Sequence, residues 1–95
     1  MNVHYTPEAI NDLNRLREFI SEKNPYAAQR IAGELLEGIN KLKVFPKMGI
    51  PVSRAPDPSM IRDLFIGSYT ARYLLTDEQI HILRLWHNKE IERGL

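Results

Sequence analysis

The sequence predicts a small α+β domain with the element order β-α-α-β-β-β, in which an antiparallel helix hairpin packs on a small twisted, mainly antiparallel sheet. Three observations lead to this prediction. Two amphipathic stretches with helical spacing fill most of residues 7–42. Three β-type runs joined by two tight connections follow in residues 61–87. A short apolar and aromatic run at residues 3–5 precedes the helices and is expected to pair within the same sheet.

Two proline-containing motifs predict where the helices begin. Thr6-Pro7-Glu8 offers an N-cap side chain, a preset first helical residue and a negative charge at the positive end of the helix dipole. Asn24-Pro25 ends the first helix near Lys23 and starts the second, so the short connection predicts an antiparallel hairpin. The predicted apolar stripes are Ile10, Leu13, Leu16 and Ile20, then Ala28, Ile31, Ala32, Leu35, Ile39 and Leu42, while Asp12 and its charged neighbours are assigned largely to other faces.

Residues 44–60 hold four of the six prolines, which excludes a helix or a central strand there. We interpret this stretch as an ordered loop, and its length for so compact a chain is typical of functional loops. Phe45, Met48, Ile50 and Val52 are expected to pin it to the core.

The hairpin signals predict a strand register. Ile66-Gly67-Ser68-Tyr69 fits a type II′ turn with glycine first, which places Leu64 opposite Ala71. The same register pairs Asp63 with Arg72, a plausible exposed ion pair across the strands. Residues 76–79 form the next turn and set Tyr73 against Ile82.

Face assignments depend on whether the last strand is regular. Without a bulge, Arg62, Tyr73, Arg84 and Trp86 share one face of the sheet, and Arg72 and His87 share the other. A bulge near Ile82-Leu83 would exchange the positions that follow it.

Composition narrows the function classes. Ninety-five residues suit a single domain, 1–95, and a net charge of +1 gives no global field toward nucleic acid or membrane. The absence of cysteine excludes disulfides, thiol catalysis and cysteine-based metal sites. No signal peptide or long apolar run is visible, and no metal-ligand spacing or phosphate-binding loop is recognisable. We therefore expect a cytoplasmic protein without a cofactor, a bound metal or a membrane partner.

An ordered set of short motifs resembles the RelE/ParE superfamily of toxins from type II toxin–antitoxin systems. Each motif alone is weak, but the set covers nearly the whole chain in order. The motifs are Pro7-Glu8-Ala9, Asn11-Asp12-Leu13, Asn24-Pro25 with Ala27-Ala28 and Arg30, Ile39 and Leu42, Pro46 with Gly49, Arg62-x-Leu64, Tyr69-x-Ala71-x-Tyr73, and Ile80-x-Ile82-Leu83-Arg84-Leu85-x-His87.

The superfamily has two main activities, and the resemblance favours one of them. RelE-like and YoeB-like members are ribosome-dependent mRNA nucleases, whereas ParE-like members inhibit DNA gyrase. Attack by a 2′-hydroxyl needs a base, an acid and cations, which RelE-like members supply with basic residues and a tyrosine. The corresponding positions here are Thr70, Asn88 and Gly94, none of which can replace an arginine or a phenol. The resemblance therefore implies a ParE-like toxin without catalytic residues.

The predicted partners are a cognate antitoxin and DNA gyrase, with no sequence-specific nucleic acid binding, in a homodimer or a hetero-oligomer with the antitoxin. The alternative is an mRNA interferase that uses His87, the one histidine near the nuclease position, with Arg62 or Arg84. Structural interpretations stay open for each site residue, such as the Asp63 pair for Arg72 and a core position for Tyr73. The candidate partner-binding residues are Arg62, Arg72, Tyr73, Arg84, Trp86, His87, Lys89 and Arg93.

Overall fold

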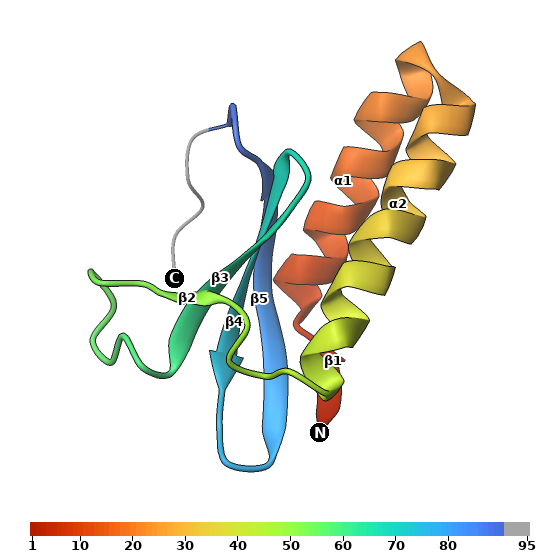
Figure 1. The fold of residues 1–95 in the computed structure, drawn as a ribbon. Helices are drawn as coiled ribbons and strands as arrows, with labels where there is room; N and C mark the ends of the chain where they lie inside the picture. Colours follow the sequence, from red (N-terminus) through yellow and green to blue (C-terminus); the bar gives the residue numbers. More distant parts are fainter. Residues whose placement is uncertain (91–95) are drawn as a thin grey trace.

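The computed structural model describes residues 1–90 and confirms the predicted α+β class. A helix hairpin covers one face of a sheet whose strand order is β1-β5-β4-β3-β2, and no helix of residues 1–90 covers the other face (Figure 1). The elements are β1 (Asn2–Tyr5), α1 (Pro7–Lys23), α2 (Pro25–Asn40), the short 3₁₀ helix η1 (Lys41–Lys43), β2 (Ile50–Pro51), β3 (Ile61–Ile66), β4 (Tyr69–Leu75) and β5 (Gln79–His87).

Both predicted helix caps are present. The Thr6 hydroxyl accepts a hydrogen bond from the Ala9 amide at 3.1 Å, and the Asn24 side chain accepts one from Ala27 at 3.1 Å. Each cap satisfies a backbone donor that has no partner inside its helix. The prolines follow directly as the first helical residues, as the sequence predicted.

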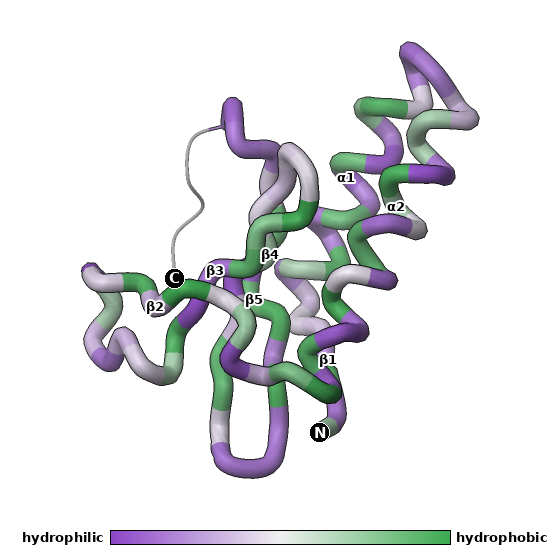
Figure 2. The backbone as a smooth tube through the Cα atoms, in the orientation of Figure 1, coloured by the Kyte–Doolittle hydropathy of each residue, from purple (hydrophilic) through white to green (hydrophobic). Residues whose placement is uncertain are grey.

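The buried face of α1 differs from the predicted stripe. It is formed by Ala9, Asp12 and Leu16, whereas Ile10 is 47% exposed. The assignment of Asp12 to an outer face was therefore wrong, because its carboxylate receives hydrogen bonds from β5 that a solvent-facing position would not allow. In α2 the prediction holds, since Ala28, Leu35 and Ile39 are buried. Green apolar segments recur along both helices in Figure 2.

The sheet joins the first strand to the last. β1 pairs with β5 in parallel, with Val3 opposite Ile80, while the pairs β5–β4, β4–β3 and β3–β2 are antiparallel. The hairpin between β3 and β4 has the predicted register, including Asp63 opposite Arg72. Gly67 has a φ of 58° in its turn, a conformation that suits glycine and the first position of a type II′ turn.

A β-bulge in β5 exchanges the side chains that follow it. Tyr73 lies opposite Ile82, but Arg72 lies opposite Arg84, so Leu83 is an additional residue in β5. The faces assigned on the assumption of a regular strand are therefore wrong for the residues after Leu83, and the alternative of a bulge near Ile82-Leu83 is confirmed. Leu85 joins the core cluster, and Trp86 lies on the face away from the helices.

The loop after η1 is ordered, but not in the predicted way. Val52 is buried as expected, whereas Phe45, Met48 and Ile50 are exposed. The prediction that these three side chains pin the loop was wrong, because hydrogen bonds from Tyr73 and Arg62 to its backbone hold it instead. Ile50 and Pro51 add a two-residue edge strand, a position that proline tolerates.

Neither helix in residues 1–90 is both long and apolar enough to cross a lipid bilayer.

Candidate functional site

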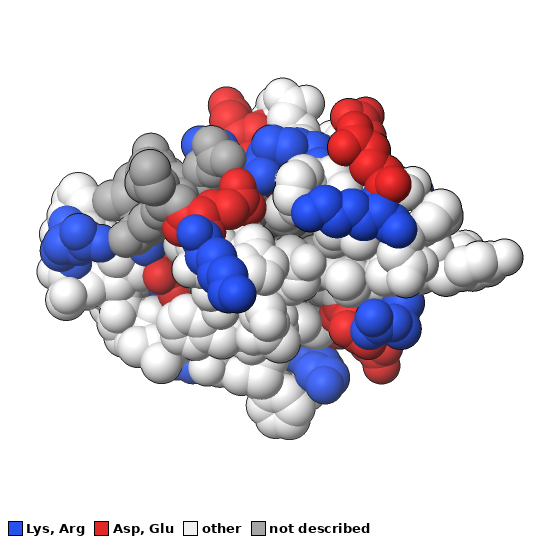
Figure 3. Space-filling model, turned by 90° about the horizontal axis from the view of Figure 1, so that it is seen from above, with Lys and Arg blue, Asp and Glu red and all other residues white. Residues whose placement is uncertain are grey.

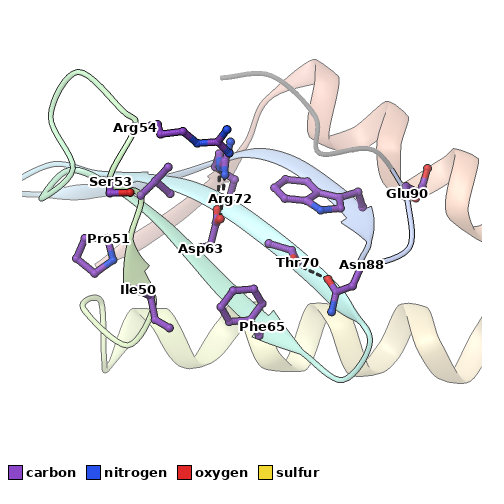
Figure 4. A pocket seen from close by; sticks show the side chains of 12 residues that line it. Ile50, Pro51, Ser53, Arg54, Asp63, Phe65, Thr70, Arg72, Asn88 and Glu90 are labelled. Atoms are coloured by element: carbon purple, nitrogen blue, oxygen red, sulfur yellow. Dashed lines mark hydrogen bonds and ion pairs between the residues drawn. The ribbon is translucent and has the colours of Figure 1, made fainter.

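The face of the sheet that the helices leave free carries a hollow of about 500 Å³ (Figure 4). Its floor comes from β3, β4 and β5, and one wall comes from the β2 segment. The lining residues are Ile50, Pro51, Val52, Ser53, Arg54, Asp63, Phe65, Thr70, Arg72, Trp86, Asn88 and Glu90.

Two neutral polar side chains, Thr70 and Asn88, are hydrogen-bonded to each other in this hollow. The family resemblance relates both positions to catalytic residues of the nuclease branch. The Thr70 hydroxyl donates to the Asn88 side-chain oxygen at 2.6 Å. Thr70 lies on β4, in the middle of the sheet, and Asn88 follows β5. The backbone amide of Asn88 donates to the Ser68 carbonyl at 2.8 Å. Neither side chain titrates near neutral pH or carries a charge.

Arg72 is bound within the hollow rather than presented to solvent. Its guanidinium donates to both carboxylate oxygens of Asp63, at 2.8 and 2.9 Å, and lies 5.1 Å from the Trp86 ring centroid. The predicted Asp63–Arg72 pair is confirmed, but it is buried rather than exposed, with 4% of the arginine side chain accessible. The pair is therefore screened little by salt.

Arg62 and Tyr73 hold the backbone of the loop after η1. Arg62 donates to the carbonyls of Ser59, Lys47 and Gly49, the last at 2.9 Å. The Tyr73 side chain is fully buried, and its hydroxyl donates to the Pro46 carbonyl and accepts from the Gly49 amide. Burial raises the pKa of Tyr73. In this structure Tyr73 is thus a core residue that is not available to a partner.

Arg84 reaches α1 instead of a neighbouring strand. It donates to both oxygens of Asp12, at 2.8 and 3.0 Å, and the Leu85 amide donates to the same carboxylate at 2.9 Å. Burial alone would raise the pKa of Asp12, but the hydrogen bonds from Arg84 and Leu85 outweigh it and lower the pKa. The hydrogen bond to Asp12 raises the pKa of Arg84.

The segment after β5 is tied to α1. Arg15 forms an ion pair with Glu90 at 2.7 Å, and the other carboxylate oxygen of Glu90 accepts from the His87 amide at 2.9 Å. The His87 ring lies edge-on against Tyr69 with centroids 5.0 Å apart, and its Nδ1 accepts from the backbone amide of Lys89 at 3.0 Å. His87 therefore serves as a local acceptor that shapes this segment.

A second, mainly apolar groove of about 630 Å³ lies between α1 and this end of the sheet. Phe19 of α1 is a large exposed aromatic in it. Charged residues stand at its rim, and on the molecular face seen from above charges of both signs are interspersed (Figure 3). The lining residues are Arg15, Leu16, Phe19, Ile20, Tyr69, His87, Lys89 and Glu90.

The structure does not gather the alternative catalytic residues into one site. Arg62 is bound to the loop, Arg84 to Asp12, and His87 packs on Tyr69 beside α1. None of the twelve residues around the free-face hollow is a histidine, lysine or tyrosine. Within residues 1–90, no cluster of three or more histidines and carboxylates could hold a metal ion.

The sequence prediction missed Asp12, the Arg15–Glu90 pair and the groove beside α1. The spacing of Asp12 from Ala9 and Leu16 was a signal for its burial, since residues three and four apart lie on the same face of a helix. Arg93 and Gly94, by contrast, lie outside the described residues.

A family model for ParE toxins of type II toxin–antitoxin systems (parDE) matches residues 3–92. Fold and match together place the chain in a class of small α+β toxins with a helix hairpin on a five-stranded sheet. The chain belongs to the ParE toxin family.

Relatives carry names from both branches of the superfamily. The chain is 31% identical to the toxin RelE2 of Caulobacter vibrioides, over 90% of this chain and 92% of that protein, and 31% identical to RelE1 of the same organism, over 86% and 87%. The chromosomal ParDE system from P. aeruginosa shares the fold, with a TM-score of 0.77 and 21% identity over 92% and 95% of the two chains. The toxin–antitoxin complex RelBE2 from Mycobacterium tuberculosis has a TM-score of 0.67 and 27% identity over 90% and 95%.

Proposed function

We propose that this toxin inhibits DNA gyrase by binding it, without cutting RNA, and that a cognate antitoxin neutralises it. The observation that carries the proposal is the Thr70–Asn88 pair in the free-face hollow. These are two of the positions at which the nuclease branch places catalytic side chains. The match to the ParE family model agrees with this choice of branch.

The two side chains at the nuclease positions do not supply what cleavage of a phosphodiester requires. A 2′-hydroxyl needs a base, the leaving oxygen needs an acid, and the phosphate needs cations as charge builds. Thr70 and Asn88 can supply hydrogen bonds but neither proton transfer at neutral pH nor charge. Arg72 is engaged by Asp63, so a phosphate would have to compete with a buried carboxylate. Binding to a protein target makes none of these demands.

The groove beside α1 is the surface we assign to the antitoxin. An amphipathic helix buries its apolar face in such a groove, here against Leu16, Phe19 and Tyr69. Two structural neighbours, ParDE and RelBE2, come from toxin–antitoxin systems, which supports a partner of this kind. The exposed Lys89 beside the groove would favour an acidic residue on the antitoxin helix, whereas Arg15 is already paired with Glu90.

The test is a gyrase supercoiling assay with the purified chain. We expect inhibition of supercoiling and accumulation of gyrase-cleaved linear DNA, because a bound inhibitor traps the cleaved intermediate. Addition of the antitoxin should restore supercoiling. A parallel reaction with ribosomes and bound mRNA should show no cleavage.

The second candidate function is that of an mRNA interferase, because two relatives at 31% identity are named RelE toxins. If the chain were an mRNA interferase, ribosome-bound mRNA would be cut, and His87→Ala would abolish the cut. Cleavage of this kind with unchanged gyrase supercoiling would overturn the proposed function.

A further inference from the structure

The loop that follows η1 has a fixed backbone. Val44 and Phe45 donate from their amides to the Lys41 carbonyl at 3.1 and 2.9 Å, and Met48 donates to Phe45 at 3.1 Å. Buried or partly buried side chains of the sheet hold its second half, through the Tyr73 hydroxyl and the Arg62 guanidinium. A segment held in this way loses little conformational entropy when it binds.

The same loop exposes its large apolar side chains. Val44 is 72% exposed and Phe45 is 63% exposed, and Met48 lies beside them. A shallow depression lined by residues 44–48 runs between these side chains. Apolar groups that a rigid backbone presents to water mark an interaction surface rather than a folding defect. We call this surface the Val44–Met48 patch.

Positive charge surrounds the patch. Lys41, Lys43 and Lys47 are exposed, and none of them makes an ion pair within residues 1–90. An apolar centre with a rim of lysines complements a protein surface with an apolar pocket and acidic residues around it. A bare phosphate would use the lysines but leave Val44 and Phe45 in water.

The patch and the antitoxin groove have no lining residue in common. The patch follows the C-terminal end of α2, whereas the groove lies beside the second half of α1 (Figure 1). Because the helices are antiparallel, the C-terminal end of α2 lies beside the start of α1, so the patch is displaced along the hairpin from the groove. One partner can therefore occupy the groove while another contacts the patch.

We infer that the Val44–Met48 patch is the surface by which the toxin contacts gyrase, and that it docks on an acidic gyrase surface with an apolar pocket for Phe45. This inference rests on the proposed function. It also gives Arg62 and Tyr73 a role, since they position the patch from behind without touching the target.

The experiment compares the double variant Val44→Ser/Phe45→Ser with Tyr26→Ser in the gyrase supercoiling assay. Tyr26 is a matched control, because it is 86% exposed and lies at the opposite tip of the hairpin. We expect the double variant to need at least about tenfold more toxin for half-inhibition, since central aromatic contacts dominate interfaces. Tyr26→Ser should stay within about twofold, as residues outside an interface do.

A second variant tests the charge. Lys41→Gln/Lys43→Gln/Lys47→Gln should slow association with gyrase and flatten its dependence on salt, since charges at the rim steer encounter. Antitoxin binding, measured on every variant, should be unchanged and shows that each variant is folded.

Each contrary outcome identifies a different error. Unchanged inhibition by the double variant, with an active wild-type chain, overturns this inference and leaves the proposed function intact. A wild-type chain that is inactive on gyrase overturns both. Loss of antitoxin binding in the double variant with inhibition preserved assigns the patch to the antitoxin. Loss of binding to anionic phosphatidylglycerol vesicles, again with inhibition preserved, assigns it to a lipid surface.

Discussion

Asp12 is the side chain that joins the first helix to the last strand. β1 pairs with β5 only as far as Ile82, so beyond that point no strand of residues 1–90 lies beside β5 on that edge. The Thr6 hydroxyl donates to the Leu83 carbonyl at 3.0 Å, and Asp12 accepts from the Leu85 amide at 2.9 Å. The side chains of Asp12 in α1 and of its N-cap Thr6 thus satisfy groups that a longer β1 would have paired.

We predict that Asp12→Asn lowers the free energy of unfolding at pH 7 by about 2–4 kcal/mol, because it removes a nearly buried charge partner of Arg84 and weakens the bond to Leu85. Urea unfolding measures this change. The exposed Asp77, in the turn before β5, is the control, and Asp77→Asn should change stability by less than about 0.5 kcal/mol.

The pH dependence follows from the lowered pKa of Asp12. Its stabilising effect is fully present above its usual pKa of about 3.9 and is lost as pH falls through the lower value of the folded state. The difference between wild type and Asp12→Asn should therefore shrink below about pH 4. A difference that stays constant down to pH 2 would contradict the assigned charge on Asp12.

The loop between η1 and β3 shows how an element without regular structure is held in one conformation. Gly49 lies so close to the sheet that a Cβ there would meet the Tyr73 hydroxyl at 2.7 Å and the Asp63 carbonyl at 2.9 Å. The Asp63 oxygen belongs to the β3 backbone and cannot move aside. Close approach of two backbones, rather than an unusual dihedral angle, therefore requires glycine at this position.

We predict opposite effects for alanine at two glycines. Gly49→Ala should destabilise the protein by about 1–3 kcal/mol through overpacking. Gly33→Ala, in an exposed position of α2 with open space around the added carbon, should stabilise it by about 0.4–1 kcal/mol. Thermal unfolding of both variants checks the pair. Equal effects would mean that Gly49 is not constrained by its surroundings.

At the scale of the whole molecule, three surfaces surround one core. The free-face hollow holds the Thr70–Asn88 and Asp63–Arg72 pairs, the groove beside α1 is mainly apolar, and the Val44–Met48 patch combines apolar and basic side chains. Only the first contains positions that the family resemblance relates to nuclease residues. With the roles proposed above for the groove and the patch, antitoxin binding and target binding should be alterable independently.

We therefore predict that Phe19→Ser weakens antitoxin binding at least about tenfold, since it removes an exposed aromatic from the groove. Gyrase inhibition by this variant alone should not change. Calorimetry with the antitoxin and the supercoiling assay measure the two effects. Coupled loss of both activities would show that groove and patch belong to one surface.

Local signals made much of the fold predictable. Thr6-Pro7 and Asn24-Pro25 determine where the helices start, since capping and proline geometry act within one turn. Gly67 determines the register between β3 and β4, because a two-residue turn leaves no freedom in pairing. The Asp63–Arg72 pair follows directly from that register.

Tertiary structure decided the faces and the roles of the site residues. The bulge at Leu83 sends Trp86 to the free face, and the sequence left this bulge open as an alternative to a regular strand without deciding between them. Asp12 is buried only because β5 passes α1 there, and Tyr73 reaches the loop from 24 residues away in sequence. Contacts of this range depend on how the helix layer seats on the sheet. The spacing of residues within one segment specifies whether it forms a helix or a strand. Which of its side chains are buried, and which groups they bind, depends on the other helices and strands that pack against it.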